Sequence, residues 1–119
     1  MIWIRWGSLI LAGGIAAGAF GAHALRDALS PDQRAVYQTA VLYQLLHGLA
    51  LVSVGILALL APHEPWLRRA GAAFLVGVLL FSGSLYVVSL TPLKRAGAVT
   101  PIGGAAFLIG WICLAMAAR

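Results

Sequence analysis

The residues best suited to chemistry in this chain lie in one short stretch, YQLLH, which runs from Tyr43 to His47. Gln44 and His47 are three positions apart, so they share one face of a helix. A histidine inside a membrane span is costly against lipid and normally faces the bundle interior or a wet cavity. His47 therefore either takes part in a proton relay or ligand contact, or serves as a neutral group between helices, hydrogen-bonded to Gln44, Ser84 or a backbone carbonyl.

Further polar side chains fall at the same depth if successive helices alternate in direction. We name the membrane face that holds both termini side A and the opposite face side B. The side A halves hold little polarity beyond Ser8, Ser53 and Cys113. The sequence thus predicts one polar cluster in the side B half, made of His23, Tyr43, Gln44, His47, Ser82, Ser84 and Tyr86. His23 ends the first apolar run, where it could equally be an interfacial side chain that reaches water.

These residues give little support for a cofactor site or a metal site. A histidine pair on facing helices can bind haem. The depths of His23 and His47 differ by about 5 to 10 Å at the helical rise, however, and nothing else indicates a porphyrin. Cys113 is the single cysteine, so it forms neither an internal disulfide nor a thiolate cluster. We expect no cofactor and no metal.

The elements that position these side chains follow from composition. The 119 residues are 62% hydrophobic and only 9% charged, which excludes a water-soluble monomer. Each membrane-crossing helix needs about 20 apolar residues, so four fit comfortably. The sequence predicts a single all-α domain over residues 1–119, an integral membrane four-helix bundle. Its expected spans are about 3–25, 41–61, 70–90 and 100–118.

Helix boundaries are marked by capping residues. Ser30, followed by Pro31 and by Gln33 three positions later, predicts a helix start with a capping box. Residues 31–40 should then be an amphipathic start that lies among the headgroups or joins the span through a bend near Thr39. Thr100, followed by proline, predicts a hydroxyl N-cap for the last helix. The first run also resembles a signal peptide, but its apolar stretch is too long, so we expect a retained helix.

The distribution of charged residues indicates neither a soluble partner nor an orientation in the membrane. The formal net charge is +5, but the eight basic residues are scattered in ones and twos, which excludes a nucleic-acid patch. Four lie on each side of the predicted bundle, so the positive-inside rule selects no orientation. The amino terminus favours a cytoplasmic side A. The balance also permits insertion both ways and an antiparallel dimer.

Small residues and one basic loop suggest two further features. Pairs such as Gly14 and Gly18 let helices approach closely, either within the bundle or between subunits. The start of the last helix follows two basic residues and is a candidate anion or lipid-phosphate site, although ordinary capping explains the same pattern. The candidate residues are Lys94, Arg95, Thr100, Gly103 and Gly104.

Four motifs in order resemble a known family. They are GAFGAHAL from Gly18, YQLLH from Tyr43, FSGSLY from Phe81 and TPIGG from Thr100, and they cover most of the chain. The pattern resembles the domain-of-unknown-function 423 family of small bacterial inner-membrane proteins, which is similar to the eukaryotic transmembrane protein 256-like group. The resemblance implies a four-helix protein in the bacterial inner membrane and supplies no catalytic residue.

The sequence does not indicate an enzyme, because no span holds a carboxylate and no nucleophile has a neighbouring base and acid. It favours a component that binds, assembles or stabilises a membrane complex, with the lipid bilayer and either further copies or other proteins as partners. The alternative is an oligomeric transporter or channel for a small solute, proton or ion. That alternative requires a continuous wet path, and the side A halves are almost wholly apolar.

Overall fold

The computed structural model describes residues 1–119, and it is entirely helical. Four helical segments are long and apolar enough to cross a membrane, which confirms the expected fold class. The third crossing is one continuous helix from Pro65 to Leu90 that contains a π-helical turn. The elements are α1 (Ile2–His23), α2 (Pro31–Leu60), α3 (Pro65–Gly77), η1 (Val78–Ser82), α4 (Gly83–Leu90), η2 (Lys94–Ala98) and α5 (Thr100–Ala117).

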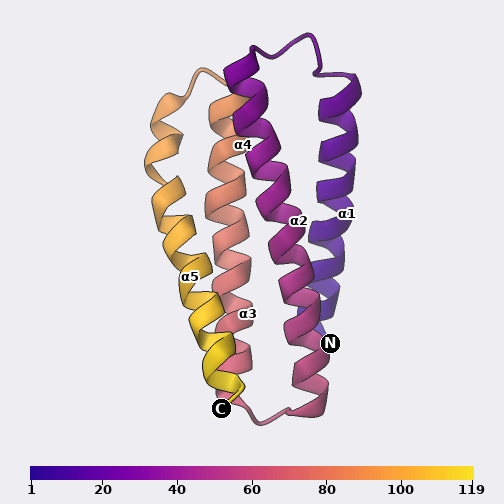
Figure 1. The fold of residues 1–119 in the computed structure, drawn as a ribbon, viewed down its shortest axis with the longest axis vertical. Helices are drawn as coiled ribbons and strands as arrows, with labels where there is room; N and C mark the ends of the chain where they lie inside the picture. Colours follow the sequence, from indigo (N-terminus) through magenta and orange to yellow (C-terminus); the bar gives the residue numbers. More distant parts are fainter.

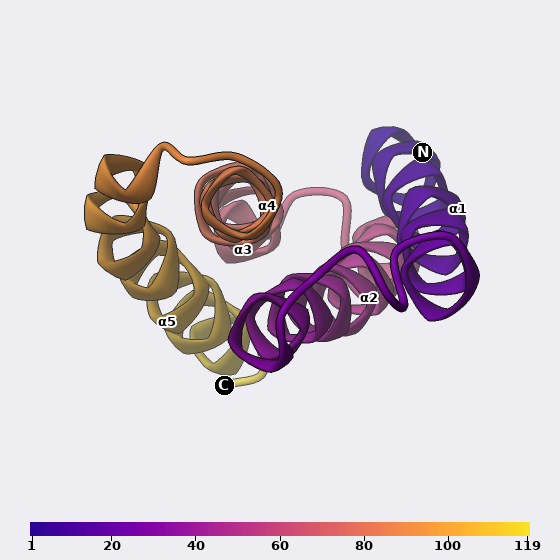
Figure 2. The same ribbon diagram turned by 90° about the horizontal axis from the view of Figure 1, so that it is seen from above.

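The crossings run antiparallel and stand in a row instead of a closed ring (Figure 1). Seen from above, α2 and the third crossing form the middle of the row, while α1 and α5 lie at its two ends (Figure 2). The extents of 48 × 26 × 17 Å describe a flat molecule. Its apolar core lies between the middle elements and α5, where Leu51, Val54 and Phe74 are completely buried.

The first turn of α2 forms as its capping residues predict. The Ser30 hydroxyl accepts a hydrogen bond from the backbone N–H of Gln33, whose side chain accepts from the backbone N–H of Ser30. The helix continues without interruption past Thr39, so residues 31–40 and the following span form one helix. Tyr37 and Ala40 are buried, which makes this first part of α2 an integral portion of the bundle.

One helix start and one helix cap differ from the expectation. The third crossing begins at Pro65, five residues early, because the Glu64 side chain accepts from the backbone N–H of Trp66 and acts as N-cap. Thr100 does not cap the last helix. Its hydroxyl lies 2.5 Å from that of Ser84, since a side-chain partner on α4 competes successfully with the backbone of α5.

Glycines set how closely α1 and α2 pack. A Cβ atom on Gly7 would lie 2.7 Å from the carbonyl oxygen of Gly48, and one on Gly14 would lie 2.6 Å from the Leu45 side chain. The expected pair of Gly14 and Gly18 is therefore only half correct, because a Cβ on Gly18 would meet nothing closer than 3.4 Å. The close approaches repeat every seven residues, a spacing that keeps them on one helix face.

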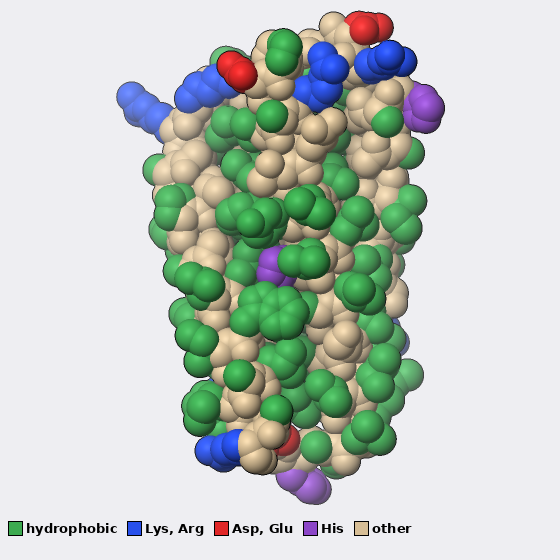
Figure 3. Space-filling view, viewed as in Figure 1, with side chains coloured by type: hydrophobic (Ala, Val, Ile, Leu, Met, Phe, Trp, Pro, Cys, Tyr) green, Lys and Arg blue, Asp and Glu red, His purple; other side chains and the backbone are tan.

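Charged side chains mark the two ends of the molecule (Figure 3). Between these ends the surface is apolar, and many large hydrophobic residues are more than half exposed, among them Leu9, Ile15 and Leu108. On side A the Arg69 guanidinium lies 4.5 Å from the ring centre of Trp66, an arrangement suited to a membrane interface. An exposed apolar band between charged ends is the surface of a protein embedded in lipid.

Candidate functional site

Gln44 connects three of the crossings. Its Nε2 donates to the carbonyl oxygen of Ile10 on α1 at 3.0 Å, and its Oε1 accepts from the Tyr86 hydroxyl on α4 at 2.5 Å. Both ends of the amide are therefore used for interhelical bonds. Without these partners, both polar atoms of the amide would be unsatisfied in lipid. The two bonds therefore fix the order of α1, α2 and α4.

Two further hydroxyls strengthen this junction. Ser82 is 1% exposed and donates to the carbonyl oxygen of Ala40 at 2.8 Å, which joins the third crossing to α2. Tyr37 donates to the carbonyl oxygen of Ala17 on α1, and its ring meets that of Tyr86 edge-on. Tyr37 was absent from the predicted cluster, although it lies on the helix face of Ala40 and Gln44.

His47 belongs to a separate group, between α2 and α5. The Trp111 indole N–H donates to its Nε2 at 3.1 Å, so Nδ1 must carry the proton, and it donates to the Tyr43 carbonyl oxygen at 2.9 Å. The imidazole is 2% exposed and stacks on Phe107, with ring centres 3.6 Å apart. Both ring nitrogens are satisfied in a neutral histidine, and the backbone-carbonyl partner was one of those expected.

The remaining predicted residues do not join one cluster. Ser84 pairs with Thr100 and thereby links α4 to α5. His23 is exposed at the end of α1 and makes no hydrogen bond through its side chain. The predicted cluster thus consists of a Gln44 group, a His47 group and the Ser84 pair, with His23 outside all of them. Apart from the bond between His47 and the Tyr43 carbonyl, which lies within α2, these bonds join different helices instead of lining a common chamber.

Some residues of the predicted anion site make contacts within the chain. The Lys94 ammonium donates to the carbonyl oxygen of Val88 at 3.1 Å, at the end of α4. Gly103 is buried against the backbone of Phe81, whereas Arg95 is exposed. Lys94 thus satisfies a carbonyl group at the end of α4, and Gly103 lets α5 pack closely on the third crossing.

A cavity of about 500 Å³ lies between α2 and α5 beside His47. Tyr43, Phe107 and Trp111 line it with aromatic surface, and Leu108 lines its α5 side. Of the polar groups at the cavity, the imidazole is fully hydrogen-bonded, while the Tyr43 hydroxyl has no partner in the chain. No three His, Cys, Asp or Glu residues gather here or elsewhere to hold a metal ion. The arrangement suits binding of an apolar group that also accepts one hydrogen bond.

The pairing of His47 with Trp111 leads to a stability prediction. We expect His47→Phe to lower the free energy of unfolding by about 1 kcal/mol, because the indole N–H loses its acceptor while the ring stack with Phe107 is kept. Unfolding by SDS, followed by far-UV circular dichroism, measures the change. Trp111→Phe should cost the same, and the double variant should cost less than the sum of the two. Additive losses would show that the bond contributes nothing.

Comparison with known proteins agrees with this architecture. A family model described as "Protein of unknown function (DUF423)" matches residues 17–104. A UPF0382 membrane protein of Staphylococcus aureus (strain bovine RF122 / ET3-1) is 40% identical over 98% of this chain and 93% of its own length. UPF0382 membrane protein YwdK of Bacillus subtilis is 42% identical, over 85% of this chain and 82% of its own. No solved structure matches.

The family match spans α2 and the third crossing completely, the end of α1 and the first residues of α5, and it includes both hydrogen-bonded groups except Ile10 and Trp111. The relatives extend the likeness over almost the entire chain and are themselves named as membrane proteins. From the matched residues and the shared length, the chain belongs to the DUF423 family of bacterial membrane proteins.

Proposed function

We propose that the protein is a binding or assembly component of a larger membrane complex and has no catalytic role. The observation that carries this proposal is the cavity between α2 and α5, which is open toward the lipid and lined by Tyr43, Phe107 and Trp111. Aromatic side chains dominate the energetics of protein interfaces, and a tyrosine hydroxyl adds one directional bond. A transmembrane helix of a partner would place an apolar side chain in the cavity and offer the hydroxyl an acceptor.

The distribution of polar groups supports binding over transport. A solute path needs polar groups from one membrane face to the other. The Gln44 group and the His47 group are directed to neighbouring helices instead, and on the side A half the Ser53 hydroxyl donates to the carbonyl of its own helix. A single bundle built in this way offers rigid helices and a docking surface, which is what an assembly component requires.

We also propose in which membrane the protein lies and how it is oriented there. Bundles of apolar helices are the form that proteins take in bacterial inner membranes, whereas outer-membrane spans are barrels. We therefore propose that the protein lies in the bacterial inner membrane, with side A in the cytoplasm. The orientation can be tested with single cysteines on the two sides, Ser30→Cys and His63→Cys in a Cys113→Ala background, and an impermeant thiol reagent added to intact cells. Only the side B cysteine should react.

Site-specific photocrosslinking tests the docking surface. A photoreactive amino acid at Leu108, which lines the cavity, is compared with one at the adjacent Ile109, which does not. The two side chains are 66% and 55% exposed, so general access is similar. We expect a product with one other membrane protein from position 108 and much less from position 109. Equal yields at both positions, or products with lipid or a second copy alone, would contradict a role in a complex with other proteins.

A further inference from the structure

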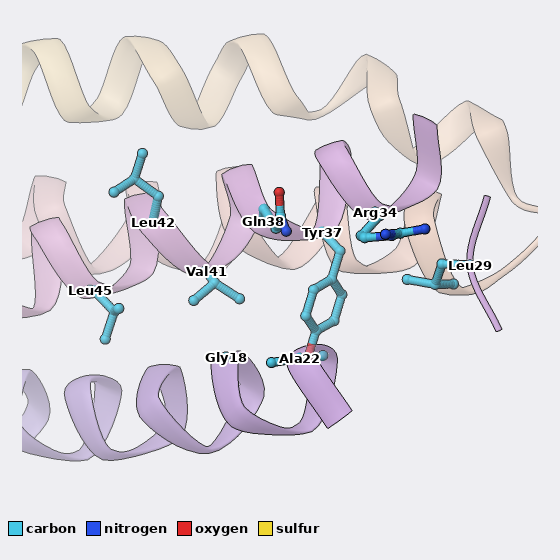
Figure 4. Close-up of a pocket in the computed structure, with 10 residues that line it drawn as sticks. Gly18, Ala22, Leu29, Arg34, Tyr37, Gln38, Val41, Leu42 and Leu45 are labelled. Carbon is cyan, nitrogen blue, oxygen red and sulfur yellow. The ribbon is translucent and has the colours of Figure 1, made fainter. Parts of the chain in front are cut away.

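A second cavity, of about 260 Å³, lies between α1 and α2 near side B (Figure 4). Val41 and Leu45 point from α2 toward α1 along its length, and Gly18 and Ala22 form the α1 side. Tyr37, which is 4% exposed, crosses between the helices at the middle of the cavity. The walls are thus mostly apolar and are open on the lipid side.

Arg34 gives the side B end of this cavity a charge without a counterion. Its Nε atom is buried and has no hydrogen-bond partner, and it is the single buried side-chain nitrogen or oxygen of the chain in that state. The two carboxylates of side B, on Asp27 and Asp32, are exposed and do not bond to it. A buried unsatisfied donor on a cation is costly, so this arrangement favours an anion at that position.

The shape of the cavity restricts what the anion belongs to. From Arg34 to Leu45 the helix rises about 16 Å, close to half of the roughly 30 Å hydrocarbon thickness. The lining therefore changes from cationic to apolar over the depth of one leaflet. A partner helix, about 10 Å wide, is too broad for a space of this volume. An extended acyl chain is narrow enough, and arginine pairs readily with phosphate oxygens.

From these observations we infer that the groove between α1 and α2 is a binding site for an anionic glycerophospholipid of the side B leaflet. The headgroup phosphate accepts hydrogen bonds from the Arg34 guanidinium, and one acyl chain lies along Val41 and Leu45 beside Gly18. The site is distinct from the cavity beside His47, and it does not depend on the proposed role in a complex.

Native mass spectrometry of the delipidated full-length protein tests this site. Dioleoylphosphatidylglycerol is titrated into the wild type, into Arg34→Gln, and into Arg95→Gln as a matched control. Arg95 is an exposed arginine on the same side of the membrane that does not line the groove. We expect one tightly held lipid in the wild type, about tenfold weaker binding in Arg34→Gln, and no change in Arg95→Gln. Equal weakening in both variants would overturn the proposal.

A second pair of variants tests the groove independently of the charge. Ala22→Phe places a ring in the cavity, whereas Ala16→Phe adds the same ring to an exposed α1 position outside it. We expect the first variant to lose the bound lipid and the second to keep it. Dioleoylglycerol and inorganic phosphate separate the two parts of the ligand, and each should bind far more weakly than the phospholipid. Equally tight binding of either one, or an unaffected Ala22→Phe, would show that the assignment is wrong.

Discussion

Gly103→Ala should destabilise the bundle by about 1 to 3 kcal/mol, whereas the same change at the next residue, Gly104, should not. A Cβ atom on Gly103 would lie 2.8 Å from both the Cα and the Cβ of Phe81, and closer still to its backbone nitrogen. Backbone atoms in the middle of a helix cannot move aside as a flexible side chain can. Helix α5 would have to withdraw from the third crossing, and the contacts of Phe107 with Gly77 would be lost.

The neighbouring glycine supplies the control for this prediction. A Cβ on Gly104 would meet the Phe81 ring at 3.8 Å, an ordinary contact, and alanine is the better helix former by roughly 0.5 to 1 kcal/mol. Gly104→Ala should therefore be neutral or slightly stabilising. Unfolding in SDS, followed by circular dichroism, measures both. Losses of equal size at the two positions would mean that α5 does not approach the third crossing through Gly103.

Gln44→Met should lower the free energy of unfolding by about 1 to 3 kcal/mol, since it removes two interhelical hydrogen bonds that are each worth about 0.6 to 1.7 kcal/mol. Methionine keeps the length and much of the volume of the side chain, so packing changes little. Both the attachment of α1 through Ile10 and the link to α4 through Tyr86 are lost. The Tyr86 hydroxyl is then left without its acceptor inside the bundle.

Two comparisons identify the source of that loss. Gln38→Met changes an exposed glutamine on the same helix that makes no side-chain hydrogen bond, and it should leave stability unchanged or raise it in lipid. Tyr86→Phe removes one of the two bonds. Combined with Gln44→Met it should cost less than the sum of the single changes. A strictly additive pair, or an equal cost at Gln38, would contradict the role of Gln44 as a junction.

The course of the chain was predictable because its signals are local. Long apolar runs mark each crossing, and the capping residues at Ser30 and Gln33 place the start of α2 correctly. The interior position of His47 also follows from its helix face, shared with Gln44 and Ala40. The use of a backbone carbonyl as a partner of His47 was also among the predicted alternatives.

The pairing of these residues was not predictable, because it depends on which helices are neighbours and how each is rotated. Trp111 reaches His47 because α5 packs against the third crossing, which is also a neighbour of α2. The π-helical turn at Val78–Ser82 is a second example: it directs Ser82 toward α2 while the adjacent Phe81 packs on α5. No residue type within VLLFS distinguishes such a turn from regular helix. A single cluster was expected where the geometry produces separate groups.

The row of crossings has a mechanical consequence. Helix α1 packs chiefly against α2 and has only Gly7 and Gly14 buried, so a single helix interface holds it in the bundle. If the amino terminus is pulled with an atomic force microscope, α1 should leave the bilayer first, as a separate low-force event. The other crossings, which share the aromatic core around Phe74, should then come out together at higher force.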